Sequence, residues 1–163
     1  MKGNVLIVDD DQSMCEMLDI DLKRRGFQVT WHTTAENAFS NLKETDFDVV
    51  LADINLPGMT GIELCERISA NRPDVPVIAI TGFGSLETAI ASIRAGAYDF
   101  IAKPIDTDIL EAALHRAITH RALQEKVKLL SQTTTKPHHF DELVGESPPM
   151  KKLFSQMTRV ADT

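Results

Sequence analysis

Several polar side chains capable of phosphoryl-transfer chemistry follow short apolar runs that are typical of β-strands. They are Asp9 and Asp10 after residues 5–8, Asp53 after 49–52, Thr81 after 77–80 and Lys103 after 98–102. Neighbouring carboxylates raise one another's pKa unless a cation lies among them. A hard divalent ion with oxygen ligands and bound waters meets this need, which indicates Mg²⁺. With Lys103 facing a free carboxylate, Asp53 becomes a candidate nucleophile for phosphoryl transfer, and Thr81 and Lys103 are candidates to hold the phosphoryl oxygens.

These side chains can meet only if the strands lie parallel, with their carboxyl ends at one edge. Five strand-like runs alternate with five helical patterns, which predicts an α/β fold with a parallel, doubly wound sheet and right-handed crossovers. The strands are expected at 5–8, 27–31, 49–52, 77–80 and 98–102. We expect the flavodoxin-like strand order 2-1-3-4-5, because the chain is short for the six-stranded dinucleotide fold. No GxGxxG follows the first strand, so dinucleotide binding has no support.

Local signals place the helices between these strands. Thr60 with Glu63, and Ser13 with Glu16, have the spacing of a capping box, and Asp11 is expected to be a loop residue. Taken singly, the strand-end residues have ordinary interpretations as turn, cap or surface residues. Their joint occurrence at four strand ends is what indicates a site.

Composition narrows the class of protein. The chain has 163 residues, of which 43% are hydrophobic and 25% charged, which fits one domain with an appendage. The net charge of −7 does not indicate the basic surface that nucleic-acid binding requires, so we do not expect this chain to bind DNA or RNA. Cys15 and Cys65 lie on apolar helix faces without zinc spacing, so we expect buried free thiols. No signal peptide or membrane-length apolar run is visible, and a cytoplasmic protein is expected.

The last predicted helix begins near Asp106 and is longer than the domain requires. Its first turns carry residues expected to pack on the sheet: Ile109, Leu110, Ala113, Leu114 and Ala117. The helical spacing continues through Leu123, Val127 and Leu130 between charged residues, so either a paired helix in a dimer or a solvated helix would explain it. Residues 131–139 read as a polar linker. A helix with an apolar face is expected after Ser147, and the chain ends at Thr163 with nothing to bury that face, which indicates a piece of a longer protein.

The motifs around the strand ends resemble the receiver domain of two-component response regulators over residues 1–122. They are Val5-Leu-Ile-Val-Asp-Asp-Asp11, Asp53-Ile-Asn-Leu-Pro-Gly-Met-Thr-Gly61, Ile80-Thr-Gly82 and Lys103-Pro104. The resemblance implies that Asp53 accepts a phosphoryl group from a sensor histidine kinase. It also implies a Mg²⁺ site formed by Asp10, Asp53 and the main-chain carbonyl of Asn55, with Asp9 assisting through water. Such a domain is a phospho-acceptor switch rather than an enzyme, with at most self-phosphorylation from small donors and self-dephosphorylation.

The same resemblance implies a conformational switch. Thr81 would move toward the phosphoryl oxygens, and the aromatic switch position, three residues before Lys103, is Phe100. Phe100 lacks the hydroxyl of the more common tyrosine, so an inward movement of its ring is the expected switch. Repacking of the face formed by helix 4, strand 5 and helix 5 would change a homodimer formed there, through the linker helix, or through both.

The tail narrows the subfamily. Residues 140–154 are similar to the opening of the AAA+ domain in sigma-54-dependent activators of the nitrogen-regulation type. Residues 94–104 are similar to the corresponding receiver segment of the same activators. We therefore expect a receiver domain at 1–122, a linker helix and polar linker at 123–139, and the N-terminal fragment of an AAA+ domain at 140–163. No nucleotide-binding loop is present, so neither ATP hydrolysis nor DNA contact is expected of this chain, although it would control such an ATPase.

Two other functions use similar residues. Aspartate-nucleophile phosphohydrolases also place an Asp after a parallel strand and bind Mg²⁺, but they carry a second acid two residues later, where this chain has Asn55. Turnover of a small phosphate ester would favour that function. An interaction module with a vestigial site is the third interpretation, and it predicts no measurable Mg²⁺ affinity.

Overall fold

The computed structural model describes residues 2–82 and 84–134. Its five parallel strands form one sheet in the order β2-β1-β3-β4-β5, so the predicted fold class is confirmed. The strands are β1 (Asn4–Val8), β2 (Gln28–His32), β3 (Val49–Asp53), β4 (Val77–Thr81) and β5 (Asp99–Ala102). The helices are α1 (Gln12–Arg24), α2 (Ala35–Glu44), α3 (Gly61–Asn71), α4 (Leu86–Arg94) and α5 (Thr107–Thr134).

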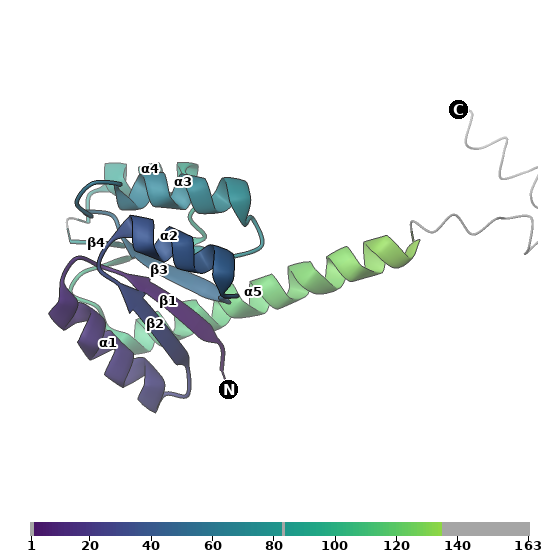
Figure 1. The fold of residues 1–163 in the computed structure, drawn as a ribbon, viewed down its shortest axis with the longest axis horizontal. Coiled ribbons are helices and arrows are strands. Elements are labelled where there is room, and N and C mark those ends of the chain that lie inside the picture. The colour runs from purple at the N-terminus through teal and green to yellow at the C-terminus, as the bar shows by residue number, and fades with distance from the viewer. Residues whose placement is uncertain (1, 83, 135–163) are drawn as a thin grey trace, which may run out of the picture. The chain divides into compact units, whose positions relative to one another are not determined.

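Helices cover both faces of the sheet, as the fully apolar central strands require. Figure 1 shows α2, α3 and α4 on one side of the strands, with α1 and the first turns of α5 on the other. Two core clusters fill these layers. One includes Leu6, Val50 and Leu64, and the other includes Ile7, Leu51 and Leu114. Alternate residues of β1 and β3 thus point to opposite faces, and every residue of β3 and β4 is buried.

The helix termini described here follow the capping rules, but the predicted start of one helix is wrong. Thr60 and Glu63 form the expected capping box at the start of α3. The α1 prediction is wrong, because Asp11 is the N-cap residue and its carboxylate accepts hydrogen bonds from the backbone N–H groups of Ser13 and Met14. Asp and Ser are both good N-caps, so spacing alone did not decide between them. After α4, Gly96 adopts a φ of +100° that other residues rarely adopt, and the helix ends before it.

Helix α5 departs from the prediction at two places. Ile109, expected to pack on the sheet, is 59% exposed. The helix continues to Thr134, so residues 131–134 of the predicted polar linker are helical. Leu123, Val127 and Leu130 are all more than half exposed, which agrees with both predicted alternatives, a paired helix and a solvated helix. The rest of the predicted linker and the predicted AAA+ fragment at 140–163 lie outside the described residues.

The chain divides into two compact units, residues 1–125 and 126–163. The predicted boundaries at residues 122 and 139 stay predictions. Both cysteines are buried free thiols, as expected. Among the described residues, no helix combines the length and the apolar character that crossing a bilayer requires.

Candidate functional site

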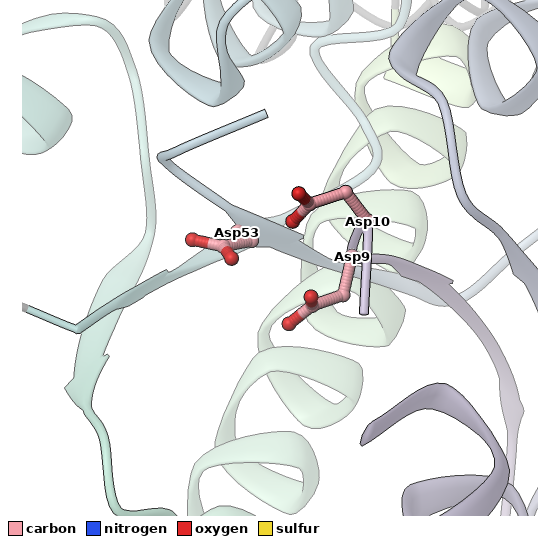
Figure 2. Close-up of side chains that lie close together, drawn as sticks. All are labelled: Asp9, Asp10 and Asp53. Carbon is pink, nitrogen blue, oxygen red and sulfur yellow. The ribbon is translucent and has the colours of Figure 1, made fainter. Parts of the chain in front are cut away.

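The carboxyl ends of β1, β3, β4 and β5 bring the predicted site residues to one edge of the sheet. Asp53 is the last residue of β3 and Thr81 is the last residue of β4, while Asp9 follows β1 and Lys103 follows β5. Figure 2 shows the side chains of Asp9, Asp10 and Asp53 converging from two neighbouring strands. Asp9, Asp53 and Thr81 are almost completely buried, at 0%, 4% and 1% exposure. The site is therefore embedded in the domain, with Asp10 on its solvent side.

Asp9 and Asp53 use their two carboxylate oxygens in the same way. The Oδ1 atom of Asp9 accepts a hydrogen bond of 2.9 Å from the backbone N–H of Asp11, and Oδ1 of Asp53 accepts one of 3.0 Å from the backbone N–H of Asn55. Such bonds to the backbone two residues later fix the turn that leaves each strand. The Oδ2 atoms of both residues point to the same partner, Lys103.

Lys103 bridges the two buried carboxylates. Its Nζ atom donates to Oδ2 of Asp9 at 2.9 Å and to Oδ2 of Asp53 at 3.0 Å. Its backbone N–H donates to the carbonyl oxygen of Thr81 at 2.7 Å, which holds the start of the β5–α5 loop against β4. A cis peptide bond joins Lys103 to Pro104. Burial disfavours the charged ammonium, but the hydrogen bonds to both carboxylates outweigh it and raise the Lys103 pKa.

The acidic residues carry more negative charge than Lys103 can compensate. Burial raises the pKa of Asp9, and the hydrogen bond from Lys103 offsets this only in part. One oxygen from each of Asp9, Asp10 and Asp53 lies within 4.8 Å of the others. If all three carboxylates are ionised, one ammonium leaves two negative charges, the charge that one divalent cation balances. The oxygen donor set and the exposed side at Asp10 fit Mg²⁺, which keeps several waters.

The remaining predicted site residues surround this cluster. Asn55 lies in the loop after β3, where its backbone N–H holds Asp53. Thr81 lies at the neighbouring strand end, since β3 pairs with β4. Phe100 lies on β5 with its side chain 41% exposed, so its ring is not enclosed in the core. The structure therefore brings Asp9, Asp53 and Lys103 into direct contact and places Phe100 at the surface.

Gly61 supports the site in a way that its place in the motif did not reveal. An added Cβ atom would collide with the carbonyl oxygen of Asp53 and would lie 2.7 Å from the Cα atom of Ile54. The Gly61 N–H donates to the carbonyl of Ile54 at 3.0 Å, so the first turn of α3 rests directly on the strand end. A thiol adds a second support, because Cys15 donates from Sγ to the Asp9 carbonyl at 3.3 Å. Neither contact has a signal in the sequence beyond residue type.

Comparison with known families agrees with this geometry. The family model described as "Response regulator receiver domain" matches residues 5–115. The chain belongs to this family. The match includes the three carboxylates, Thr81 and Lys103, so the receiver domain accounts for the sheet and for the cluster at its carboxyl edge.

Curated relatives of this receiver domain are transcriptional regulators. The chain is 35% identical over 158 residues to the transcriptional regulatory protein ZraR of Klebsiella oxytoca, covering 97% of this chain and 34% of that protein. It is 34% identical over 160 residues to the C4-dicarboxylate transport transcriptional regulatory protein DctD of Rhizobium meliloti, covering 98% and 35%. The chain thus spans about a third of the length of the curated relatives it matches.

Solved structures give the same result. NtrX from Brucella abortus, solved in complex with ADP, superposes with a TM-score of 0.76 at 33% identity, covering 99% of this chain and 36% of that one. A response regulator receiver domain from Clostridium thermocellum superposes with a TM-score of 0.72 at 26% identity, covering 75% and 98%. In sequence, the chain is 34% identical over its whole length to the nitrogen assimilation regulatory protein NtrX of Azorhizobium caulinodans, which agrees with the predicted resemblance to nitrogen-regulation-type activators.

Proposed function

We propose that Asp53 is the phospho-acceptor of a two-component system. A carboxylate oxygen of Asp53 attacks the phosphorus of a phosphohistidine on a sensor kinase. An O–P bond forms, the N–P bond breaks, and the imidazole leaves with the electron pair and takes up a proton. The observation that carries this proposal is the position of the Lys103 ammonium, 2.9 Å from Asp9 and 3.0 Å from Asp53.

The surrounding residues have distinct roles in this transfer. Lys103 neutralises the negative charge that accumulates on the phosphoryl oxygens, which is the main means of catalysis in such reactions. Asp9, Asp10, Asp53 and the main-chain carbonyl of Asn55 would hold Mg²⁺, with Asp9 acting through water. The ion supplies charge neutralisation and orientation when bound. Thr81 hydrogen-bonds a phosphoryl oxygen through its hydroxyl, which couples β4 to the phosphorylation state.

The experiment is phosphorylation by acetyl phosphate with Mg²⁺, followed by intact-mass analysis. Wild-type protein gains one phosphoryl group and Asp53→Asn gains none. Equal labelling of the Asp53→Asn variant contradicts the assignment. Continuous release of phosphate from a small phosphate ester would instead indicate a phosphohydrolase. The neutral side chain of Asn55, in the position of the second acid of those enzymes, does not support that activity.

Exposed apolar side chains support a dimer as the output of this switch. Leu86, Ile90 and Ile93 of α4 are at least 42% exposed, and Phe100 of β5 is 41% exposed. Leu123, Val127 and Leu130 follow one another at steps of four and three residues along α5, as in a paired helix. We propose that phosphorylation repacks the α4–β5–α5 face, with Thr81 and Phe100 moving together, and changes a homodimer formed there or along α5. In a protein with the length of these curated relatives, such a dimer would control a sigma-54 activator ATPase.

Solution mass tests the dimer. Light scattering with and without beryllofluoride, which mimics the phosphoryl group, should give different oligomeric states in the presence of Mg²⁺. Asp53→Asn should give one state under both conditions. An unchanged mass in the wild type would remove the dimer from the mechanism and leave the phospho-acceptor assignment intact.

A further inference from the structure

Arg121 occupies the last buried position on the sheet-facing side of α5. Leu110, Leu114 and Ala117 are fully buried on this side, and Arg121 follows four residues later with its side chain only 5% exposed. From Ala122 to Thr133 every residue is exposed. A charged group stands where the helical period calls for an apolar one, and a buried charge is tolerated only when it is paired and hydrogen-bonded.

The guanidinium of Arg121 binds the segments that lead into two strands. It donates to the carbonyl oxygen of Phe47 at 2.6 Å and to the carboxylates of Asp48 at 3.1 Å, Asp46 at 2.9 Å and Asp74 at 3.2 Å. Residues 46–48 directly precede β3, and Asp74 lies three residues before β4. A single side chain of α5 therefore holds the N-terminal ends of the strands that carry Asp53 and Thr81 at their other ends.

Asp48 extends this network to a third strand. Its Oδ2 atom accepts a hydrogen bond of 2.7 Å from the backbone N–H of Asn4, the first residue of β1. Its backbone N–H in turn donates to the Asn4 carbonyl at 2.8 Å. Through Asp48, Arg121 is connected to the strand that leads to Asp9 and Asp10. The network thus touches the N-terminal ends of all three strands that supply the acidic cluster and Thr81.

A second arginine, Arg72, shares two of these carboxylates. Arg72, just after α3, donates to Asp74 and to Asp46, both at 2.8 Å. Its hydrogen bond is the main reason that the Asp74 pKa falls to about 2. Burial disfavours the charge on Arg121, but its bonds to Asp46 and the neighbouring carboxylates outweigh burial and raise its pKa. The pairs therefore stay charged at neutral pH.

We propose that Arg121 is a positioning residue that transmits the state of the phosphorylation site to the turns of α5 that follow it. This inference rests on the proposed function. Phosphorylation changes the contacts at the carboxyl ends of β3 and β4, and each of these strands is a fully buried five-residue segment. Movement at one end of such a strand reaches the other end, where Arg121 couples it to the helix. Replacing the guanidinium should disconnect α5 without affecting the chemistry at the opposite edge.

Three variants test this coupling. Arg121→Met removes the charge and retains most of the side-chain stem; Asp46, Asp48 and Asp74 can then be hydrated, because their side chains are 69%, 37% and 39% exposed. Asp74→Asn keeps the guanidinium but neutralises one partner, and covers the case that Arg121→Met does not fold. Glu125→Gln is the matched control, because Glu125 is the 56% exposed partner of Arg121 on the same helix.

Two readouts on each protein separate the outcomes. Acetyl phosphate labelling is measured by intact mass, and amide hydrogen exchange of residues 122–134 is measured with and without beryllofluoride and Mg²⁺. We expect wild type and Glu125→Gln to be labelled and to change exchange in this segment. Arg121→Met should be labelled at the wild-type rate but lose the exchange response, and Asp74→Asn should lose part of it.

The failures are distinguishable. If the wild type is not labelled, the proposed function fails. If the wild type is labelled and residues 122–134 do not respond, or if Arg121→Met keeps the full response, the transmission role of Arg121 is overturned. It is also overturned if Glu125→Gln loses as much response as Arg121→Met, or if Arg121→Met loses labelling, because Arg121 would then act on stability or chemistry.

Discussion

Replacing Gly61 with alanine tests how closely α3 packs against the end of β3, at Asp53. The new Cβ atom would lie 2.7 Å from the Asp53 carbonyl carbon and closer still to the carbonyl oxygen. Optimal non-bonded contacts are roughly 3.5 Å, so the helix and the strand end must separate by about 1 Å. All the obstructing atoms belong to the backbone, so no side chain can rotate away to relieve the contact.

Both stability and phosphorylation should suffer. Overpacking of this kind costs about 3 kcal/mol, the upper part of the usual range, because the obstruction is rigid. For a domain of this size that corresponds to a decrease in Tm of roughly 10 °C. The displaced atoms belong to Asp53 itself, and a misplacement of ~1 Å can reduce the rate of a positioned reaction about 100-fold. We therefore expect Gly61→Ala to lose most acetyl phosphate labelling at temperatures where it remains folded.

Gly82→Ala is the matched control. Gly82 directly follows Thr81 at the same edge of the sheet, and an added Cβ atom there meets nothing within 4 Å. Its stability should stay within about 0.5 kcal/mol of wild type. Thermal and urea unfolding followed by circular dichroism measure both variants. A Gly61→Ala protein as stable and as readily labelled as Gly82→Ala would refute the close approach of α3 to Asp53.

Three further predictions concern charge. Lys103→Met should reduce acetyl phosphate labelling by about 100-fold, because the phosphoryl oxygens lose their cationic partner. Its Mg²⁺ affinity, measured by calorimetry, should not fall, because the acidic cluster loses the ammonium that competes with the ion. A fall in Mg²⁺ affinity would contradict the geometry. Asp10→Asn should weaken Mg²⁺ binding about tenfold by removing a charged ligand, whereas Asp106→Asn, outside the site, should not. The Asp74 pKa is lowered to about 2, mainly by the hydrogen bond from Arg72, so its contribution to stability is present above pH 4 and is lost as pH falls toward 2. The Asp74 side chain is 39% exposed, so this contribution to stability is small. Between about pH 4 and pH 2, the free energy of unfolding measured in urea should decrease less for Asp74→Asn than for wild type. An equal decrease in both proteins would contradict the role of the Asp74 carboxylate.

The sequence predicted the fold well because its signals are local and repeated. Val49–Ala52 is apolar at every position, and such a run followed by Asp53 and a capping box at Thr60 predicts a covered parallel strand followed by a helix. The meeting of Asp9, Asp53 and Lys103 followed from topology alone, since parallel strands end at the same edge. Each of the five strands differs from its predicted range by one residue at one or both ends, because the hydrogen-bonded ladder between strands and the apolar run within a strand do not end at the same residue.

The contacts that sequence reasoning missed depend on distances between segments far apart in the chain. Arg121 lies more than 70 residues from Phe47 and Asp48, and its position in the helical period gave no indication that acceptors would surround it. Met17 fits the apolar period of α1 but is 49% exposed, because that helix buries a narrower stripe than its sequence offers. Gly61 entered the prediction only as the last residue of the motif that begins at Asp53, and only the packing of α3 on Asp53 shows why a side chain is excluded there.

In each buried carboxylate, one oxygen contacts the loop that follows its strand and the other contacts Lys103. This arrangement indicates how a reaction at Asp53 could affect a neighbouring strand. Asp53 holds the loop after β3 with Oδ1 and Lys103 with Oδ2, so no oxygen of this side chain is free of a structural contact. Any group attached to Asp53 must therefore change either the Asn55 turn or the Lys103 bridge. Lys103 is fixed to β4 through the Thr81 carbonyl, so a change at the bridge reaches the next strand directly. Under the proposed function, a phosphoryl group on Asp53 would therefore alter hydrogen bonds that already connect β3 to β4.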